Sequence, residues 1–133
     1  MQLILDQRIL DAMRAHVESC LPLEGCGLLA GAGNVVREVL TVTNQAKSPI
    51  RFRMDPFEQI QAFEQIEASG LDLLGIFHSH PAGPEMASAT DISEAAYPVV
   101  HIIWSRQERT WKMRGFWFDE GQPSDVELVL PEK

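Results

Sequence analysis

The chain is organised around the stretch HSHPAGPEMASATD, which runs from His78 to Asp91. A strand predicted over residues 71–80, with LLGIF as its buried run, would carry His78 and His80 on one face because side chains alternate along a strand. Asp91 follows His80 by eleven positions. Two imidazoles and a carboxylate around an open position are typical ligands of a catalytic zinc ion. Ordinary strand histidines can also form a His-x-His pair, so the metal hypothesis depends on other residues.

A zinc hydrolase also needs a general base close to the reacting water, and Glu24 is our candidate. It follows Pro22 and immediately precedes an apolar strand predicted over residues 25–31, where an acid at the strand edge can face a cleft. The alternative is a solvated acid in a loop. Composition does not choose among the 19 acidic residues of the chain.

Ser88 lies three residues before Asp91 and has two competing interpretations. It could cap a short helix predicted over residues 88–97, which would stabilise that helix by ~1 kcal/mol. It could instead donate a hydrogen bond to a developing oxyanion. Spacing does not separate the two roles. We interpret His101, inside the apolar run VVHIIW, as a core or strand-edge histidine and His16 as a surface residue.

The periodicity predicts a mixed sheet flanked by helices, an α/β or α+β fold. Asp6 and Asp55 are expected to cap the first two helices, and Pro56 suits a first helical position. The second helix is expected to bury Phe57, Ile60, Phe63 and Ile66. Helices are expected over residues 6–20, 55–69 and 88–97, and strands over residues 25–31, 35–42, 50–54, 71–80, 99–104, 110–118 and 126–130.

Composition limits the setting in which the protein works. The 133 residues suggest a single domain over residues 1–133, with 45% apolar and 23% charged residues. A net charge of −8 without a basic cluster argues against nucleic acid as a partner. No apolar run is long enough for a membrane span, and the N-terminus does not read as a signal peptide, so a cytoplasmic location is expected. Cys20 and Cys26 are then expected to be free thiols, although their redox state stays open.

Taken together, these residues resemble the JAMM (MPN+) zinc metalloprotease family in its compact prokaryotic form. Its signature has a distant glutamate, here Glu24 before GCGLLAG, and then His-Ser-His-Pro, Ser88 and Asp91. Seven residues separate His80 from Ser88, and two separate Ser88 from Asp91. Further stretches support the resemblance over nearly the whole chain: Asn44, Pro49, Met54-Asp55-Pro56 and Gly75-Ile76. Many relatives have proline before the signature serine, where this chain has Ala87.

The resemblance implies a fold similar to cytidine deaminase, with a curved mixed sheet between helices. It implies one Zn²⁺ ligated by His78, His80 and Asp91 with a water as fourth ligand, Glu24 as general acid/base, and Ser88 as a hydrogen-bond donor to the tetrahedral intermediate. Family members remove ubiquitin-like proteins from lysines or cleave small adducts from ubiquitin-like sulfur carriers. We therefore expect a peptidase or isopeptidase acting after such a C-terminal tail, which would pair with a sheet edge. Residues 50–54 would form one wall of its groove.

Two other functions compete with this expectation. A non-catalytic scaffold of the same fold would usually lack part of the ligand set, which is complete here. A deaminase would need a Cys-x-x-Cys ligand pair, and the spacing of Cys20 and Cys26 does not offer one. The segment between Asp91 and Pro98 is too short for the insertions of chain-specific deubiquitinases. The substrate and the oligomeric state, including a homodimer, are left open by the sequence.

Overall fold

The computed structural model describes residues 1–93, 95 and 97–131. Its elements follow in chain order as β1 (Gln2–Ile4), α1 (Gln7–Cys20), β2 (Cys26–Ala32), β3 (Val35–Val42), α2 (Pro56–Ala68), β4 (Asp72–His80), α3 (Ala89–Ser93), β5 (Val100–Gln107), β6 (Thr110–Asp119) and β7 (Gln122–Val129). No helix among these residues is long and apolar enough to cross a membrane.

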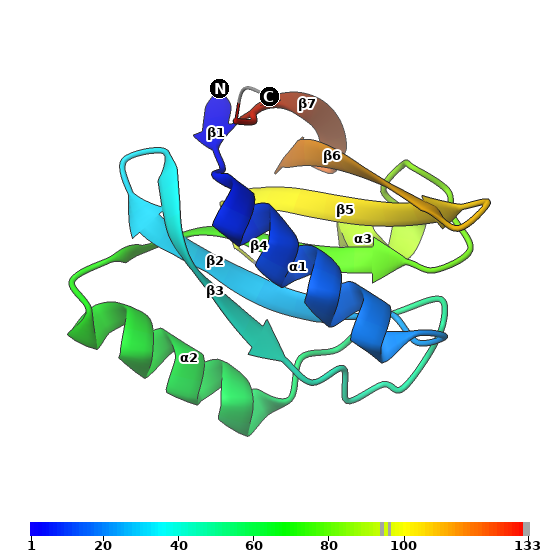
Figure 1. Cartoon of the computed structure of the whole chain (residues 1–133), viewed down its shortest axis with the longest axis horizontal. Helices are drawn as coiled ribbons and strands as arrows, with labels where there is room; N and C mark the ends of the chain where they lie inside the picture. The colour runs from blue at the N-terminus through cyan, green and yellow to red at the C-terminus, as the bar shows by residue number, and fades with distance from the viewer. Residues whose placement is uncertain (94, 96, 132–133) are drawn as a thin grey trace.

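The strands form one curved mixed sheet in the order β1-β3-β2-β4-β5-β6-β7, and pairing of β1 with β7 closes it. β4 and β5 are parallel, whereas β2 pairs antiparallel with both β3 and β4. Figure 1 shows β1 and β7 side by side. The predicted mixed sheet with helices is confirmed, but β1 was not expected because a three-residue strand has too little periodicity to be recognised.

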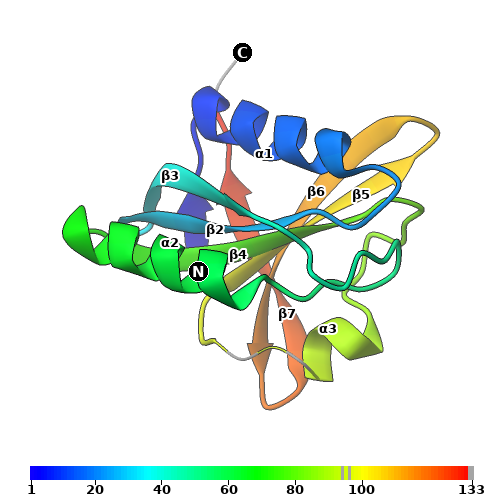
Figure 2. The same cartoon turned by 90° about the horizontal axis from the view of Figure 1, so that it is seen from below.

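The central strands bury both of their faces, one under α1 and the other under α2. Leu29 and Phe77 pack with Met13 of α1, while Leu28 and Ile76 pack with Ile66 of α2. Figure 2 shows α1 and α2 on opposite sides of β2 and β4. The first helix is as predicted: its buried stripe is Ile9, Met13 and Val17, and the Asp6 carboxylate accepts a hydrogen bond from the Ile9 N–H at 2.9 Å.

The predicted buried stripe of the second helix is wrong at two positions. Phe57 is 81% exposed and Ile60 is 55% exposed. The residues that α2 buries are Ala62 and Ile66, one turn apart, because the small Ala62 side chain lets the helix lie close to the sheet. Phe57 and Ile60 lie rotated away from that stripe. The helix start is as predicted, since Asp55 accepts hydrogen bonds from the Phe57 and Glu58 N–H groups.

The strand predicted over residues 50–54 is absent, and only one isolated bridge joins Asn44 to Met54. The Asn44 side chain takes the place of a neighbouring strand: its Oδ1 accepts from the Arg53 N–H at 2.9 Å, and its Nδ2 donates to the Arg51 carbonyl at 3.0 Å. The expected pairing of a substrate tail with a sheet edge is not possible at β4 itself. β4 is flanked on both sides by β2 and β5, so an extended tail has no free sheet edge beside His78.

Two C-terminal predictions are corrected at their ends. β7 begins at Gln122, before the predicted strand, because Glu120 and Gly121 adopt φ values of 50° and 76° and reverse the chain in a tight hairpin turn. The helix expected over residues 88–97 is shorter, since α3 ends at Ser93. Residues 94 and 96 of that prediction lie outside the described part of the chain.

Candidate metal centre

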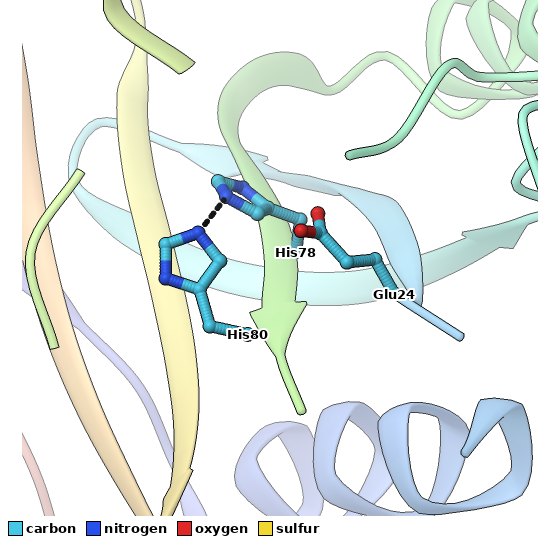
Figure 3. Close-up of side chains that lie close together, drawn as sticks. All are labelled: Glu24, His78 and His80. Atoms are coloured by element: carbon cyan, nitrogen blue, oxygen red, sulfur yellow. Dashed lines mark hydrogen bonds between the residues drawn. The ribbon is translucent and has the colours of Figure 1, made fainter. Parts of the chain in front are cut away.

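The end of β4 carries the two histidines on one face, as their spacing predicts. The Nε2 atoms of His78 and His80 lie 3.2 Å apart, and both side chains are buried. Figure 3 shows the two rings joined by a dashed line, with the Glu24 carboxylate beside them. Phe52, from the irregular segment before α2, stacks on the His78 ring with 4.5 Å between ring centroids. The ring of His78 is thereby held in place by an aromatic contact.

Asp91 on α3 completes the cluster. Its Oδ1 lies 3.2 Å from the His78 Nε2, and its Oδ2 lies 3.0 Å from the His80 Nε2. Ser88 fixes this carboxylate, because its backbone N–H donates to the Asp91 Oδ2 at 2.8 Å and its Oγ accepts from the Asp91 N–H at 3.0 Å. Burial alone would raise the pKa of Asp91, but the hydrogen bonds from His78 and His80 outweigh it and hold the pKa well below its usual range.

The tautomer of His80 is fixed from outside the cluster. Its Nδ1 lies 2.8 Å from the Pro84 carbonyl oxygen, which can only accept a hydrogen bond, so Nδ1 carries the hydrogen and the neutral ring presents the Nε2 lone pair inward. Burial lowers the pKa of His80, but the bonds to Asp91 and Pro84 raise it above its ordinary value. Burial lowers the pKa of His78, which favours its neutral form.

Glu24 is buried, with 1% of its surface exposed, rather than lying at the rim of a cleft. Its backbone is held on both sides: the N–H donates to the Ser48 carbonyl at 2.9 Å, and its carbonyl accepts from Asn44 Nδ2 at 3.0 Å. The next N–H, that of Gly25, donates to the Ser79 Oγ at 2.8 Å, which ties this segment to β4. Hydrogen bonds to three separate parts of the chain therefore hold the Glu24 backbone in its position near the histidines.

The Glu24 carboxylate has a buried oxygen whose hydrogen-bonding capacity the described residues leave unused. No described residue forms a hydrogen bond with its buried Oε1. Burial raises its pKa to about 7, although the nearby His80 opposes the shift. One ligand atom each from Glu24, His78 and His80 lie within 4.8 Å of one another. An acid of this kind exchanges a proton near neutral pH if water reaches it.

The separations between these atoms fit a bound metal ion. Tetrahedral zinc with Zn–N and Zn–O distances of about 2.0–2.1 Å places neighbouring ligand atoms about 3.3 Å apart. The observed separations are 3.2 Å between the ring nitrogens, and 3.2 and 3.0 Å from these nitrogens to Asp91. Two neutral imidazoles and an ionised carboxylate are also the donor types that Zn²⁺ accepts. The cluster can hold a metal ion with little rearrangement.

The raised pKa of Glu24 leads to a prediction for the metal-free protein. An unfolded glutamate titrates near its ordinary value of 4.5, whereas folded Glu24 titrates at about 7. Between these pH values the folded state keeps a proton that the unfolded state has lost. The contribution of Glu24 to the free energy of unfolding is therefore complete below about pH 4.5 and is lost as the pH rises through about 7. We expect Glu24→Gln to gain free energy of unfolding relative to wild type over this range.

This prediction can be checked by urea unfolding of both proteins in excess chelator at about pH 5 and about pH 8. Other titrating groups are shared by the two proteins, so their contributions largely cancel in the difference. A difference in unfolding free energy that stays constant with pH would show that Glu24 does not hold a proton in the folded protein.

A cavity of about 370 Å³ adjoins the cluster. Its lining includes His78 and Asp91 together with Phe52, Tyr97 and His101. Sequence reasoning placed residues 50–54 near a groove, and residues 52–54 do line this cavity. It missed the contact of Phe52 with His78. It interpreted His101 as a core or strand-edge histidine, which agrees with its burial on β5 but does not foresee its place in the cavity wall. A contact between segments so far apart leaves no local signal in a single sequence.

The two cysteines lie outside the cluster. Both are free, and Cys26 is fully buried with its Sγ donating to the Val42 carbonyl at 3.4 Å. Burial raises the pKa of the Cys26 thiol to about 12, so it stays protonated and unreactive at neutral pH. His16, expected at the surface, is half-buried, and its Nε2 lies 3.0 Å from the Cys26 carbonyl.

Comparisons with known proteins agree with this arrangement. A family model described as prokaryotic homologs of the JAB domain matches residues 6–117. The desampylase of Pyrococcus furiosus is 39% identical over 131 residues, which cover 96% of this chain and 90% of the relative. The probable TtuB-protein conjugate cleaving protease of Thermus thermophilus is 38% identical over 129 residues, covering 96% and 82%. The solution structure of a Desulfitobacterium hafniense protein matches with a TM-score of 0.88 at 33% identity, covering 100% of this chain and 94% of that one. The chain therefore belongs to the compact prokaryotic branch of the JAB family, the JAMM metalloproteases.

Proposed function

We propose that this protein is a zinc-dependent isopeptidase or peptidase that cleaves the bond after the C-terminal tail of a ubiquitin-like or sulfur-carrier protein. The observation that carries the proposal is the convergence of two imidazoles, an ionised carboxylate and a buried glutamate with a free oxygen. Two relatives are named as a desampylase and as a conjugate-cleaving protease. In this proposal residues 1–133 form one domain, which the pairing of β1 with β7 supports.

His78, His80 and Asp91 would hold the zinc ion in this proposal. When bound, zinc would lower the pKa of a coordinated water and polarise the scissile carbonyl. The surrounding residues orient the ligand atoms toward the position of the metal ion. The Pro84 carbonyl holds the hydrogen of the neutral His80 ring on Nδ1, which leaves Nε2 as the atom that faces the metal position, and the two Ser88 hydrogen bonds keep Asp91 turned toward the rings.

Glu24 would act as the general acid/base. Its Oε1 has no hydrogen-bond partner among the described residues, so it can accept a proton from the attacking water and later deliver that proton to the departing amine. A pKa of about 7 suits both steps near neutral pH, because the proton is then easily taken up and given away. Its tightly held backbone fixes the position from which the carboxylate acts.

Ser88 can fill both of the roles that its sequence position left open. Its Oγ accepts the hydrogen bond from the Asp91 N–H, which uses an oxygen lone pair and leaves the hydroxyl hydrogen available. No described residue accepts that hydrogen. In this proposal it is donated to the oxyanion that develops on the scissile carbonyl.

The surroundings of the cluster favour a protein substrate. Pro56 and Gln59 of α2 line the cavity, and the same two turns of α2 expose the large apolar side chains of Phe57 and Ile60. An exposed apolar pair beside a reactive cavity gives the folded part of a ubiquitin-like protein a surface to cover. The net charge of −8 keeps nucleic acid an unfavourable partner.

The proposal is tested by hydrolysis of defined conjugates. Purified protein loaded with zinc should cleave a ubiquitin-like protein from the ε-amino group of a lysine, or a small adduct from a sulfur carrier's C-terminus, and excess chelator should stop it. Mass spectrometry of the products identifies the bond that is cut. A non-catalytic scaffold predicts no stoichiometric zinc and no cleavage of either substrate. That result would overturn the proposal.

A further inference from the structure

His101 forms part of the cavity wall next to the metal centre. It pairs in parallel register with Ile76 of β4, so it lies on the same face of the sheet as Ile76, His78 and His80. Only 5% of its surface is exposed, and it lines the cavity together with His78 and Asp91. It therefore faces whatever fills the cavity.

The hydrogen bonds of His101 leave one ring nitrogen free. The ring bonds to the backbone carbonyl of Tyr97, and the buried Nε2 has no partner among the described residues, so the bond to Tyr97 is made by Nδ1. Burial lowers the pKa of His101 to about 4, so the ring is neutral near pH 7. With its hydrogen on Nδ1, the neutral ring presents an unshared lone pair at Nε2. The Nε2 of His101 is thus a buried acceptor to which no residue in the described part of the chain donates.

The cavity suits a narrow peptide segment. Its volume of about 370 Å³ is at the small end of the range for ligand sites, which is ~300–1,000 Å³. Most of its wall is apolar, with Phe52, Met54, Ile76 and Tyr97 among the lining residues. An extended peptide of small residues fits such a space and offers one backbone N–H at each residue. Because β4 has no free edge, its backbone carbonyls do not serve those N–H groups, and a side-chain acceptor in the cavity wall can.

We propose that His101 is a substrate-binding residue, whose Nε2 accepts a hydrogen bond from a backbone N–H of the carrier protein's C-terminal segment. This inference rests on the proposed function, because it takes that segment as the occupant of the cavity. It assigns one specific acceptor to one amide of the tail. It also accounts for a buried polar atom that the metal centre and Glu24 do not use.

The test pairs a change in the protein with a change in the substrate. The probe is a fluorescent peptide of the last six residues of a ubiquitin-like tail ending in Gly-Gly, joined to a lysine ε-amino group. His101→Phe removes the acceptor and keeps a flat ring, which the Phe118 ring 4.7 Å away can still contact. His101→Gln keeps an acceptor oxygen. A lost hydrogen bond should raise Kd and KM for the peptide about 3- to 10-fold in His101→Phe, and His101→Gln should recover much of this.

N-methylation of each tail amide in turn identifies the donor. The penalty of methylation is the factor by which it raises Kd. For one peptide this penalty should be about 3- to 10-fold larger in wild type than in His101→Phe, because only wild type has a hydrogen bond to lose. A purely structural role of His101 would give equal penalties in both proteins. Fluorescence anisotropy reads this binding in the absence of turnover, and zinc content and the unfolding midpoint confirm that the variants are folded.

The outcomes separate this inference from the proposed function. Equal penalties for every methylated peptide, or a His101→Phe Kd within about twofold of wild type, would overturn the role of His101 even if conjugates are cleaved. Tail binding with the expected coupling but no hydrolysis of any conjugate would overturn the enzymatic function and leave the role of His101 intact.

Discussion

Glu24→Gln is expected to lower kcat for conjugate hydrolysis about 10²- to 10⁴-fold while the protein keeps its zinc. Glutamine has nearly the same shape as glutamate, so it should preserve the packing around a side chain that is 1% exposed. Its amide cannot take a proton from water at neutral pH. The proposed ligand atoms, on His78, His80 and Asp91, are not altered.

The measurement needs the rate and the metal content of the same sample. Glu38→Gln is a matched control. Glu38 on β3 also has a buried carboxylate oxygen that bonds to none of the described residues, yet Glu38 pairs with Ala30 at the opposite end of β2 from Glu24. It should hydrolyse conjugates at nearly the wild-type rate. Full activity in Glu24→Gln would show that another group is the base. An equal loss in Glu38→Gln would mean that buried charge in general, rather than Glu24, controls the rate.

The proposed ligand cluster was largely predictable because its parts follow local rules. Alternation along β4 is enough to put His78 and His80 on one face. Ser88 and Asp91 are joined by hydrogen bonds of the kind that start helices, and this local geometry turns the carboxylate back toward the strand. Its position before an apolar strand made Glu24 a candidate, but only the family signature singled it out among the 19 acidic residues. Its burial depends on Asn44, Ser48 and Ser79, whose contacts with this segment cannot be deduced from residue spacing.

The errors in the fold also have identifiable physical causes. Residues 50–54 alternate like a strand, but the side chain of Asn44 bonds to the Arg51 carbonyl and the Arg53 N–H, two groups that a neighbouring strand would otherwise pair with. The second helix has apolar residues on two faces. Periodicity cannot tell a face that covers the sheet from one that stays exposed, and here Phe57 and Ile60 form the exposed face. This second apolar face exposes two large apolar side chains that a binding partner could cover.

His80→Ala is expected to lose stoichiometric zinc and, with it, hydrolysis. The Nε2 of His80 lies 3.2 Å from that of His78 and 3.0 Å from Asp91. Removal of the His80 ring therefore leaves two of the three proposed zinc ligands. Changes to groups that merely orient zinc ligands typically weaken metal binding 10- to 100-fold, so loss of a ligand should weaken it by more than about 100-fold. Asp91 also loses one of its two histidine partners and should hold its position less well.

Competition with a chromophoric chelator measures the zinc affinity of wild type and His80→Ala. His16→Ala is the control: His16 lies on α1 and bonds to the Cys26 carbonyl, so its loss should leave zinc affinity unchanged. Wild-type affinity should also fall as the pH is lowered through the range in which histidines protonate, because a protonated ring cannot bind metal. His80→Ala should show a shallower fall, since one proton fewer competes with the metal. Wild-type protein without zinc, or a His80→Ala variant that binds zinc as tightly as wild type, would contradict the assignment of His80 as a ligand.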